Sequence, residues 1–119
     1  MKLQSYKDLE VWNRSISLVK AIYMITKQLP KTEQYGLISQ IQRAAVSIPS
    51  NIAEGYARKG TIEYINFLSI AYGSAAEIET QLIIINQQYP QLITDEAVSL
   101  TNEVQKMLYT MLSKLKTRV

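Results

Sequence analysis

The sequence predicts an all-α protein, a single domain of residues 1–119 that forms an antiparallel up-down-up-down four-helix bundle. Apolar residues recur with the 3.6-residue period of an amphipathic helix in four stretches. Breaks near Pro30, Gly60 and Pro90 separate these stretches, and the connections are as short as those of helical bundles. We therefore expect helices over about residues 8–28, 33–58, 61–88 and 95–116.

The first predicted helix carries two apolar rows, one through Trp12 and one through Leu18. A face this wide suits a helix that packs against two neighbours. Pro30 ends the helix, because the residue before a proline is pushed out of the helical region.

The second predicted helix contains Pro49, which has no amide hydrogen to donate to the carbonyl of Ala45 and whose ring crowds the preceding turn. Ile41, Ile48 and Ile52 nevertheless keep the same helical phase on both sides of the proline. We therefore expect one helix that is kinked at Pro49.

The third predicted helix, with Thr61 as its N-cap, is apolar nearly all round. Each helix of a four-helix bundle keeps one side toward solvent, so this surplus of apolar surface predicts contact between subunits. Small residues from Gly73 to Ala76 leave room for another helix to approach closely.

The fourth predicted helix opens with Thr94 as a cap and with Asp95 at the positive pole of the helix dipole. It closes with Lys114, Lys116 and Arg118, and cations are expected near a helix C-terminus for the same electrostatic reason.

Composition excludes several kinds of site. Cysteine and histidine are absent, so disulfides, the usual zinc sites, Cys/His and Ser/His nucleophiles and the Glu-x-x-His pattern of di-iron bundles are all excluded. We expect no enzyme, no cofactor and no metal. No secretory signal is visible, and no apolar run approaches the roughly 20 residues of a membrane span. The formal charge of +3 permits nucleic-acid contact without demanding it, and we expect a cytoplasmic protein that does not bind membranes.

One arc of the second helix is polar but contains no lysine and mostly short side chains, which predicts a contact surface and not a solvated face. Because helices two and three are expected to turn back near Gly60, Arg43 should lie level with Glu77. The structural interpretation is a hydrogen-bonded network in which Arg43 pairs with Glu77 or Glu79, within a subunit or across an interface. Its members are Arg43, Ser47, Ser50, Asn51, Glu54, Arg58, Glu77 and Glu79.

The alternative interpretation is contact with nucleic acid, since arginine and amide side chains bind phosphates and base edges. The basic residues concerned are Arg43, Arg58, Lys59, Lys106, Lys114, Lys116 and Arg118. A catalytic or metal-binding role for Glu54, Glu63, Glu77 and Glu79 is a weaker hypothesis, because pairing with neighbouring cations explains these carboxylates.

Several segments resemble a known family. YKDLEVW at 6–12, YGLISQIQRAAVSIPSNIAEGYAR at 35–58 and EYINFLSIAYGSAAEIETQL at 63–82 are similar to the four-helix-bundle proteins of the 23S rRNA intervening-sequence family. SIPSNIAEG is among the most specific parts, and Gln42 stands where the family often has a basic residue. The resemblance implies a cytoplasmic bacterial bundle that assembles into a ring-like homopentamer without enzymatic activity. The bundle is also similar to the accessory protein of diversity-generating retroelements, a basic pentamer that works with a reverse transcriptase and nucleic acid.

We therefore expect a non-enzymatic homo-oligomer that serves as a structural or interaction module, with the pentamer number taken from the resemblance alone. The alternative is an RNA- or DNA-binding accessory protein, which salt-dependent binding would distinguish. A third hypothesis is a small-molecule or metal site in the lumen of the ring.

Overall fold

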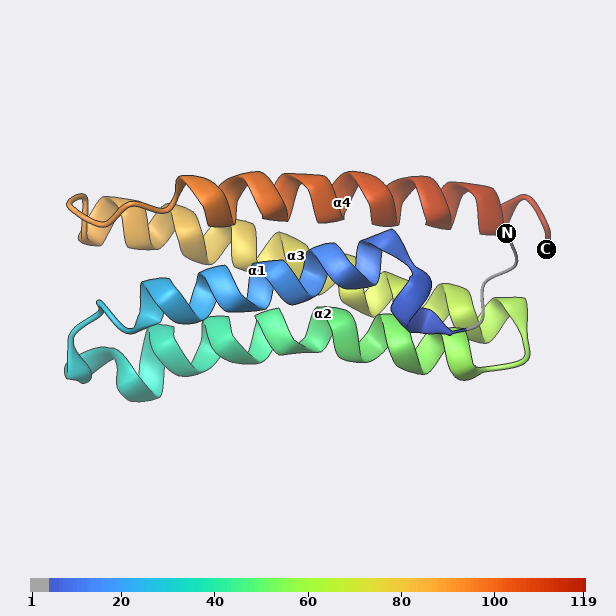
Figure 1. The fold of residues 1–119 in the computed structure, drawn as a ribbon, viewed down its shortest axis with the longest axis horizontal. Helices are drawn as coiled ribbons and strands as arrows, with labels where there is room; N and C mark the ends of the chain where they lie inside the picture. Colours follow the sequence, from blue (N-terminus) through green and yellow to red (C-terminus); the bar gives the residue numbers. More distant parts are fainter. Residues whose placement is uncertain (1–4) are drawn as a thin grey trace.

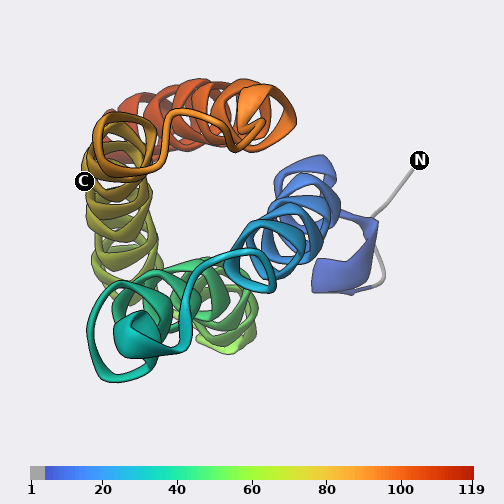
Figure 2. The ribbon, with the colours of Figure 1, turned by 90° about the vertical axis from the view of Figure 1, so that its left-hand side faces the viewer.

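The computed structural model describes residues 5–119, which form four long helices and contain no strand. These are α1 (Glu10–Thr26), α2 (Ser39–Ala57), α3 (Thr61–Gln88) and α4 (Asp95–Lys116). Successive helices run in opposite directions (Figure 1). Each helix packs against two others, so that α1 and α3 both contact α2 and α4 and lie on opposite sides of the bundle (Figure 2). The prediction of an all-α four-helix bundle is confirmed.

The core runs along the centre of this bundle, and all four helices contribute to it. Burial of each large aliphatic side chain stabilises the fold by about 1.5–3 kcal/mol relative to exposure. The largest fully buried apolar side chains are Leu18, Ile22, Ile41, Ile48, Ile52, Leu68, Ile78, Leu82, Ile85, Val104 and Leu108. None of the described helices has the sustained apolar length that a membrane crossing needs.

Helix α1 is shorter at both ends than the predicted range of 8–28. A 3-10 turn at Tyr6–Asp8 precedes it, and the extended backbone of Leu9 separates the turn from the helix. The rings of Tyr6 and Trp12 meet edge to face, with 5.3 Å between their centroids. This aromatic contact holds the 3-10 turn against the first turn of α1.

The start of the second helix also differs from the prediction. A 3-10 turn at Lys31–Glu33 leads into a π-helical turn at Gln34–Ile38, in which Gly36 departs from helical geometry with φ −117° and ψ −108°. Regular α2 begins only at Ser39, and it continues through the buried Pro49 without a break. The kink at Pro49 stays a prediction.

Helices α3 and α4 span the predicted ranges, but their caps are not those that the sequence suggested. Thr61 is the first residue of α3, and Gly60, in an extended conformation, is the N-cap. Thr94 occupies the N-cap of α4, but its hydroxyl bonds the side chain of Asn86 at 2.8 Å and caps no amide of α4. The Thr94 hydroxyl thus binds the α3–α4 connection to the end of α3 and does not cap α4.

Helices α2 and α3 approach each other closely at Gly55. An ideal Cβ atom at this position would lie 2.7 Å from the Cβ of Phe67 and 3.0 Å from Cδ1 of Tyr64. Both distances are shorter than ordinary van der Waals contact. The absence of a side chain at Gly55 therefore sets the separation of the two helices.

One hydrogen bond ties the two connections at the same end of the bundle together. The hydroxyl of Tyr89, after α3, donates to a carboxylate oxygen of Glu33, before α2, over 2.6 Å. This bond raises the pKa of Tyr89 above its ordinary value of 10.0, with smaller contributions from desolvation and from the negative charge of Glu33.

The raised pKa of Tyr89 gives a pH-dependent contribution to stability. The neutral hydroxyl stabilises the fold fully below about pH 10, and this contribution is lost as pH rises and the hydroxyl ionises. We expect Tyr89→Phe to be less stable than wild type at about pH 8, with a difference that shrinks as the pH rises above about 10. Urea denaturation of both proteins across this range measures the difference. A difference that does not change with pH would contradict this role of the hydrogen bond.

Candidate functional site

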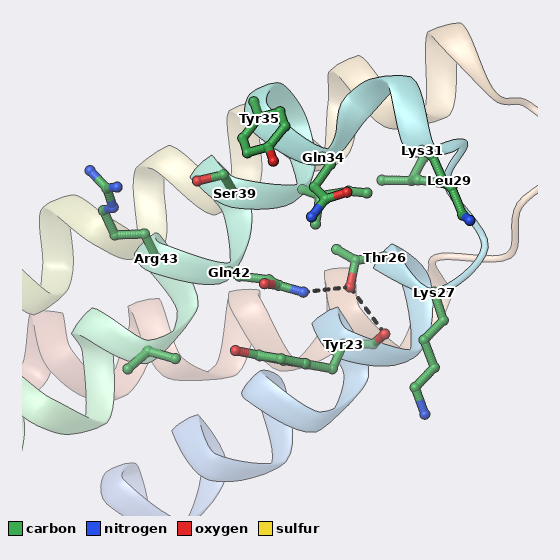
Figure 3. A pocket seen from close by; sticks show the side chains of 12 residues that line it. Tyr23, Thr26, Lys27, Leu29, Lys31, Gln34, Tyr35, Ser39, Gln42 and Arg43 are labelled. Atoms are coloured by element: carbon green, nitrogen blue, oxygen red, sulfur yellow. Dashed lines mark hydrogen bonds between the residues drawn. The ribbon is translucent and has the colours of Figure 1, made fainter.

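A groove lies between the end of α1 and the beginning of α2, with a volume of about 780 Å³ (Figure 3). The π-helical turn before α2 forms part of its wall, and π-helical turns are frequent at functional sites. The groove is lined by Tyr23, Thr26, Lys27, Leu29, Lys31, Gln34, Tyr35, Ile38, Ser39, Gln42, Arg43 and Val46.

The groove is positively charged. Lys27, Lys31 and Arg43 line it, and no aspartate or glutamate does. Within residues 5–119 none of these three cations forms an ion pair, since the ion pairs there join Arg14 to Glu10 and Glu103, and Arg58 to Glu54. These charges are therefore available to an anionic ligand, and we call this groove between α1 and α2 the cationic groove.

Hydrogen bonds hold the centre of the groove in place. The Gln42 amide nitrogen donates to the hydroxyl of Thr26 over 3.0 Å, and this hydroxyl donates to the carbonyl of Tyr23 over 3.1 Å (Figure 3). The first bond joins α2 to α1, and the second, within α1, fixes the Thr26 hydroxyl that receives it. The middle of the groove is thus a fixed polar surface between two tyrosines.

A second groove, of about 420 Å³, lies between α2 and α3 and shares Tyr35, Ser39 and Arg43 with the first. Ser47 stands at its base, where its hydroxyl oxygen accepts from Asn51 and from the Ser74 hydroxyl, each over 2.9 Å. Asn51 also donates to the Ser47 carbonyl at 2.8 Å. Arg43 therefore lies between the two grooves and lines both of them.

The residues predicted to form one polar network fall into separate groups in the chain. Ser47 and Asn51 belong to the cluster at the base of the second groove, while Ser50 is exposed. Glu54 pairs with Arg58 at 3.1 Å, and the Arg58 guanidinium lies 5.1 Å from the centroid of the Phe67 ring.

The predicted partners of Arg43 lie on α3. Glu77 lines the second groove together with Arg43, but the two form no ion pair within the chain. Glu79 accepts a hydrogen bond from Gln105 of α4 at 3.3 Å. Arg43 is therefore not neutralised within the described chain, and its pairing across a subunit interface stays a prediction.

The basic residues predicted to contact nucleic acid lie apart from Arg43. Lys59 follows α2, and Lys114, Lys116 and Arg118 belong to the last part of the chain. All four are exposed at the end of the bundle opposite the cationic groove (Figure 1). Arg58 lies at this end too, and the exposed Lys106 projects from the middle of α4.

Sequence reasoning missed most of the groove, because the predicted break at Pro30 gives the wrong register between α1 and α2. A return centred on Pro30 would bring positions whose numbers sum to about 60 level with each other and would place Lys27 near Glu33. In the structure the 3-10 and π-helical turns over residues 31–38 shift the register, so that Thr26 bonds to Gln42.

No three acidic, histidine or cysteine side chains within residues 5–119 come together in a way that could hold a metal ion. The glutamates considered as catalytic groups or ligands are spread along α2 and α3, with Glu54 paired to an arginine. These glutamates are therefore separate side chains and do not form one acidic site within residues 5–119.

The fold and its cationic groove define a small four-helix-bundle protein with a charged surface groove. The chain belongs to the family of 23S rRNA-intervening sequence proteins, whose family model matches residues 7–110. The resemblance inferred from the sequence is confirmed.

A solved structure supports the same assignment. The chain is similar to a protein of unknown function from the S23 ribosomal protein family of Bacteroides thetaiotaomicron VPI-5482, whose crystal structure was determined at 1.70 Å. The two share 25% sequence identity, the alignment covers 86% of this chain and 97% of the other, and the TM-score is 0.75. No match is found among curated proteins. Neither the family nor the solved structure is described by an enzymatic activity.

Proposed function

We propose that this protein is a cytoplasmic, self-assembling interaction module, whose copies associate through the outward face of α3, defined as Ile62, Ile70, Gly73, Ala76, Ile83 and Ile84. The main support for self-assembly is the exposure of the four isoleucines on this face. Their exposed fractions are 64% for Ile62, 52% for Ile70, 54% for Ile83 and 39% for Ile84.

These residues lie on one side of the helix because they follow its 3.6-residue period opposite the buried row of Leu68, Ala75, Ile78 and Leu82. Between the outer isoleucines the side chains of this face are small, and a Cβ atom built on Gly73 meets no atom from another part of the chain within 4 Å. Exposed Ser69 and Thr80 lie among these residues, so the face carries rows of apolar side chains and not one continuous apolar patch. Exposed large apolar side chains gathered on one side of a helix still mark an interaction surface. A second copy of the chain, which brings the same apolar face, is the partner that this surface fits.

Native mass spectrometry tests the proposal by counting the chains in each complex. We expect a multiple of the 13.6 kDa chain mass, with five copies as the number that the family resemblance implies. Single chains alone, at concentrations where the protein is folded, would contradict self-assembly.

A second candidate function is that of an RNA- or DNA-binding accessory protein. The observation that favours it is a set of cations that form no ion pair within residues 5–119. They lie at both ends of the bundle, in the cationic groove at one end and around Lys114, Lys116 and Arg118 at the other. Unpaired lysines and arginines neutralise phosphates and release counterions, which gives affinity that falls steeply with salt.

Removal of the C-terminal charges tests this candidate. If the end of α4 contributes, a variant with Lys114→Gln, Lys116→Gln and Arg118→Gln should bind nucleic acid more weakly than wild type. The slope of log affinity against log salt should also become shallower by up to about 2. Fluorescence polarisation from about 50 to 200 mM salt measures both. Affinity that does not change with salt would contradict a phosphate-binding role.

A further inference from the structure

We infer that the cationic groove binds a single strand of nucleic acid, with phosphates on Lys27, Lys31 and Arg43 and a base stacked on Tyr35. This inference rests on the nucleic-acid-binding candidate function, and it names both the form of the ligand and its place on the bundle. Three features of the groove support it: unpaired charge, exposed aromatic rings and a polar centre.

The charge of the groove favours a ligand with more than one anionic group. Figure 3 shows Arg43 at one end of the groove and Lys27 and Lys31 at the other. Glu33, the acidic residue nearest to Lys31 in the sequence, does not line the groove. Its carboxylate accepts a hydrogen bond from the hydroxyl of Tyr89. A ligand with successive phosphates can contact both ends at once, whereas a single phosphate can contact only one.

The aromatic rings favour unpaired bases. Tyr35 is 92% exposed on the π-helical turn, which is unusual for a large aromatic side chain in a folded protein. Tyr23, on α1, is 40% exposed along the same groove. Proteins that bind single strands combine a positive groove with such rings, on which bases stack. In a duplex the base faces are already stacked and cannot reach a tyrosine.

The polar centre of the groove suits a base edge. The amide nitrogen of Gln42 is engaged with Thr26, and its carbonyl oxygen accepts no hydrogen bond within residues 5–119. This oxygen can therefore accept from the amino or imino group of a base that lies between the two tyrosines. Because no residue of α3 lines the groove, association through the outward face of α3 is compatible with an occupied groove.

Fluorescence polarisation with a labelled single strand of about 12 uridines, and with an RNA duplex of equal length, tests the inference. Wild type should bind the single strand more tightly than the duplex. Tyr35→Ala should weaken single-strand binding about tenfold and leave duplex binding unchanged. Lys31→Gln and Arg43→Gln should each make the salt slope shallower by about 1.

Two matched variants serve as controls. Tyr109→Ala removes a tyrosine that is 62% exposed on α4, and Lys7→Gln removes an exposed cation in the 3-10 turn before α1, which does not line the groove. Both should affect single-strand binding less than their counterparts in the groove. Circular dichroism confirms that each variant keeps its helices, which is expected because these side chains lie on the surface.

The outcomes separate this inference from the candidate function beneath it. Single-strand binding that the groove variants leave unchanged would overturn the groove assignment but keep nucleic-acid binding at another surface. A preference for duplex, or equal effects of Tyr35→Ala and Tyr109→Ala, would also overturn the inference. Absence of binding to both ligands would overturn the inference and the nucleic-acid function together.

Discussion

Replacement of Gly55 by alanine should destabilise the fold by about 2 kcal/mol. The new methyl group would lie 2.7 Å from the Cβ of Phe67 and 3.5 Å from the backbone oxygen of Tyr64. Since neither atom is the end of a flexible side chain, α2 and α3 must move apart to accept it. Alanine is the better helix former by up to about 1 kcal/mol, which offsets only part of this cost. A melting temperature lower by roughly 5–10 °C is the expected result.

Gly73→Ala is the matched control for this substitution. It is the same chemical change in a helix that neighbours α2, but within a single chain no atom beyond the neighbouring backbone of α3 lies within 4 Å of the added methyl group. Because Gly73 belongs to the outward face of α3, we expect the change to stabilise the dissociated chain by up to about 1 kcal/mol. Urea denaturation of both variants, at a concentration where sedimentation shows single chains, compares the free energies of unfolding. Equal stability of the Gly55→Ala and Gly73→Ala variants would contradict the close approach of α2 and α3 at Gly55.

Ile70→Glu should abolish self-association. Ile70 is 52% exposed in the outward face of α3, and a carboxylate at this position would be buried without a partner when two copies meet. A penalty of about 3 kcal/mol corresponds to a dissociation constant raised by roughly 100-fold. The isolated bundle should keep its helices, because the side chain at position 70 points away from the core. Sedimentation equilibrium measures the mass, and circular dichroism measures the helix content.

Ile93→Glu controls for the effect of an added charge. Ile93 is 81% exposed, but it lies in the connection between α3 and α4 and not on the outward face of α3. The Ile93→Glu variant should retain the mass of the wild-type assembly. Equal losses of mass in the two variants would show that association does not depend specifically on α3.

The fold could be predicted from the sequence because helical periodicity and chain breaks are local signals. The apolar row through Ile41, Ile48 and Ile52 and the break at Pro30 determine where helices lie and where they turn. The ends of helices were less predictable. The π-helical turn before Ser39 and the side-chain bond of Thr94 to Asn86 both depend on tertiary contacts that no local pattern encodes.

The candidate site was less predictable than the fold for the same reason. A polar arc on one helix predicted a single network of eight side chains, of which Ser47 and Asn51 form a hydrogen bond because both belong to one stretch of α2. It could not show that Arg43 lines the same groove as Lys27 and Lys31, because this depends on how α1 and α2 are paired. Exposure of Tyr35 likewise follows from the π-helical turn and not from residue spacing.

Further copies of the chain should cover the exposed isoleucines of α3. Multi-angle light scattering of the wild-type protein at known concentration measures this association directly. We expect a mass of two or more chains of 13.6 kDa, and a return to 13.6 kDa in the Ile70→Glu variant. A wild-type mass of 13.6 kDa at every concentration would contradict this association.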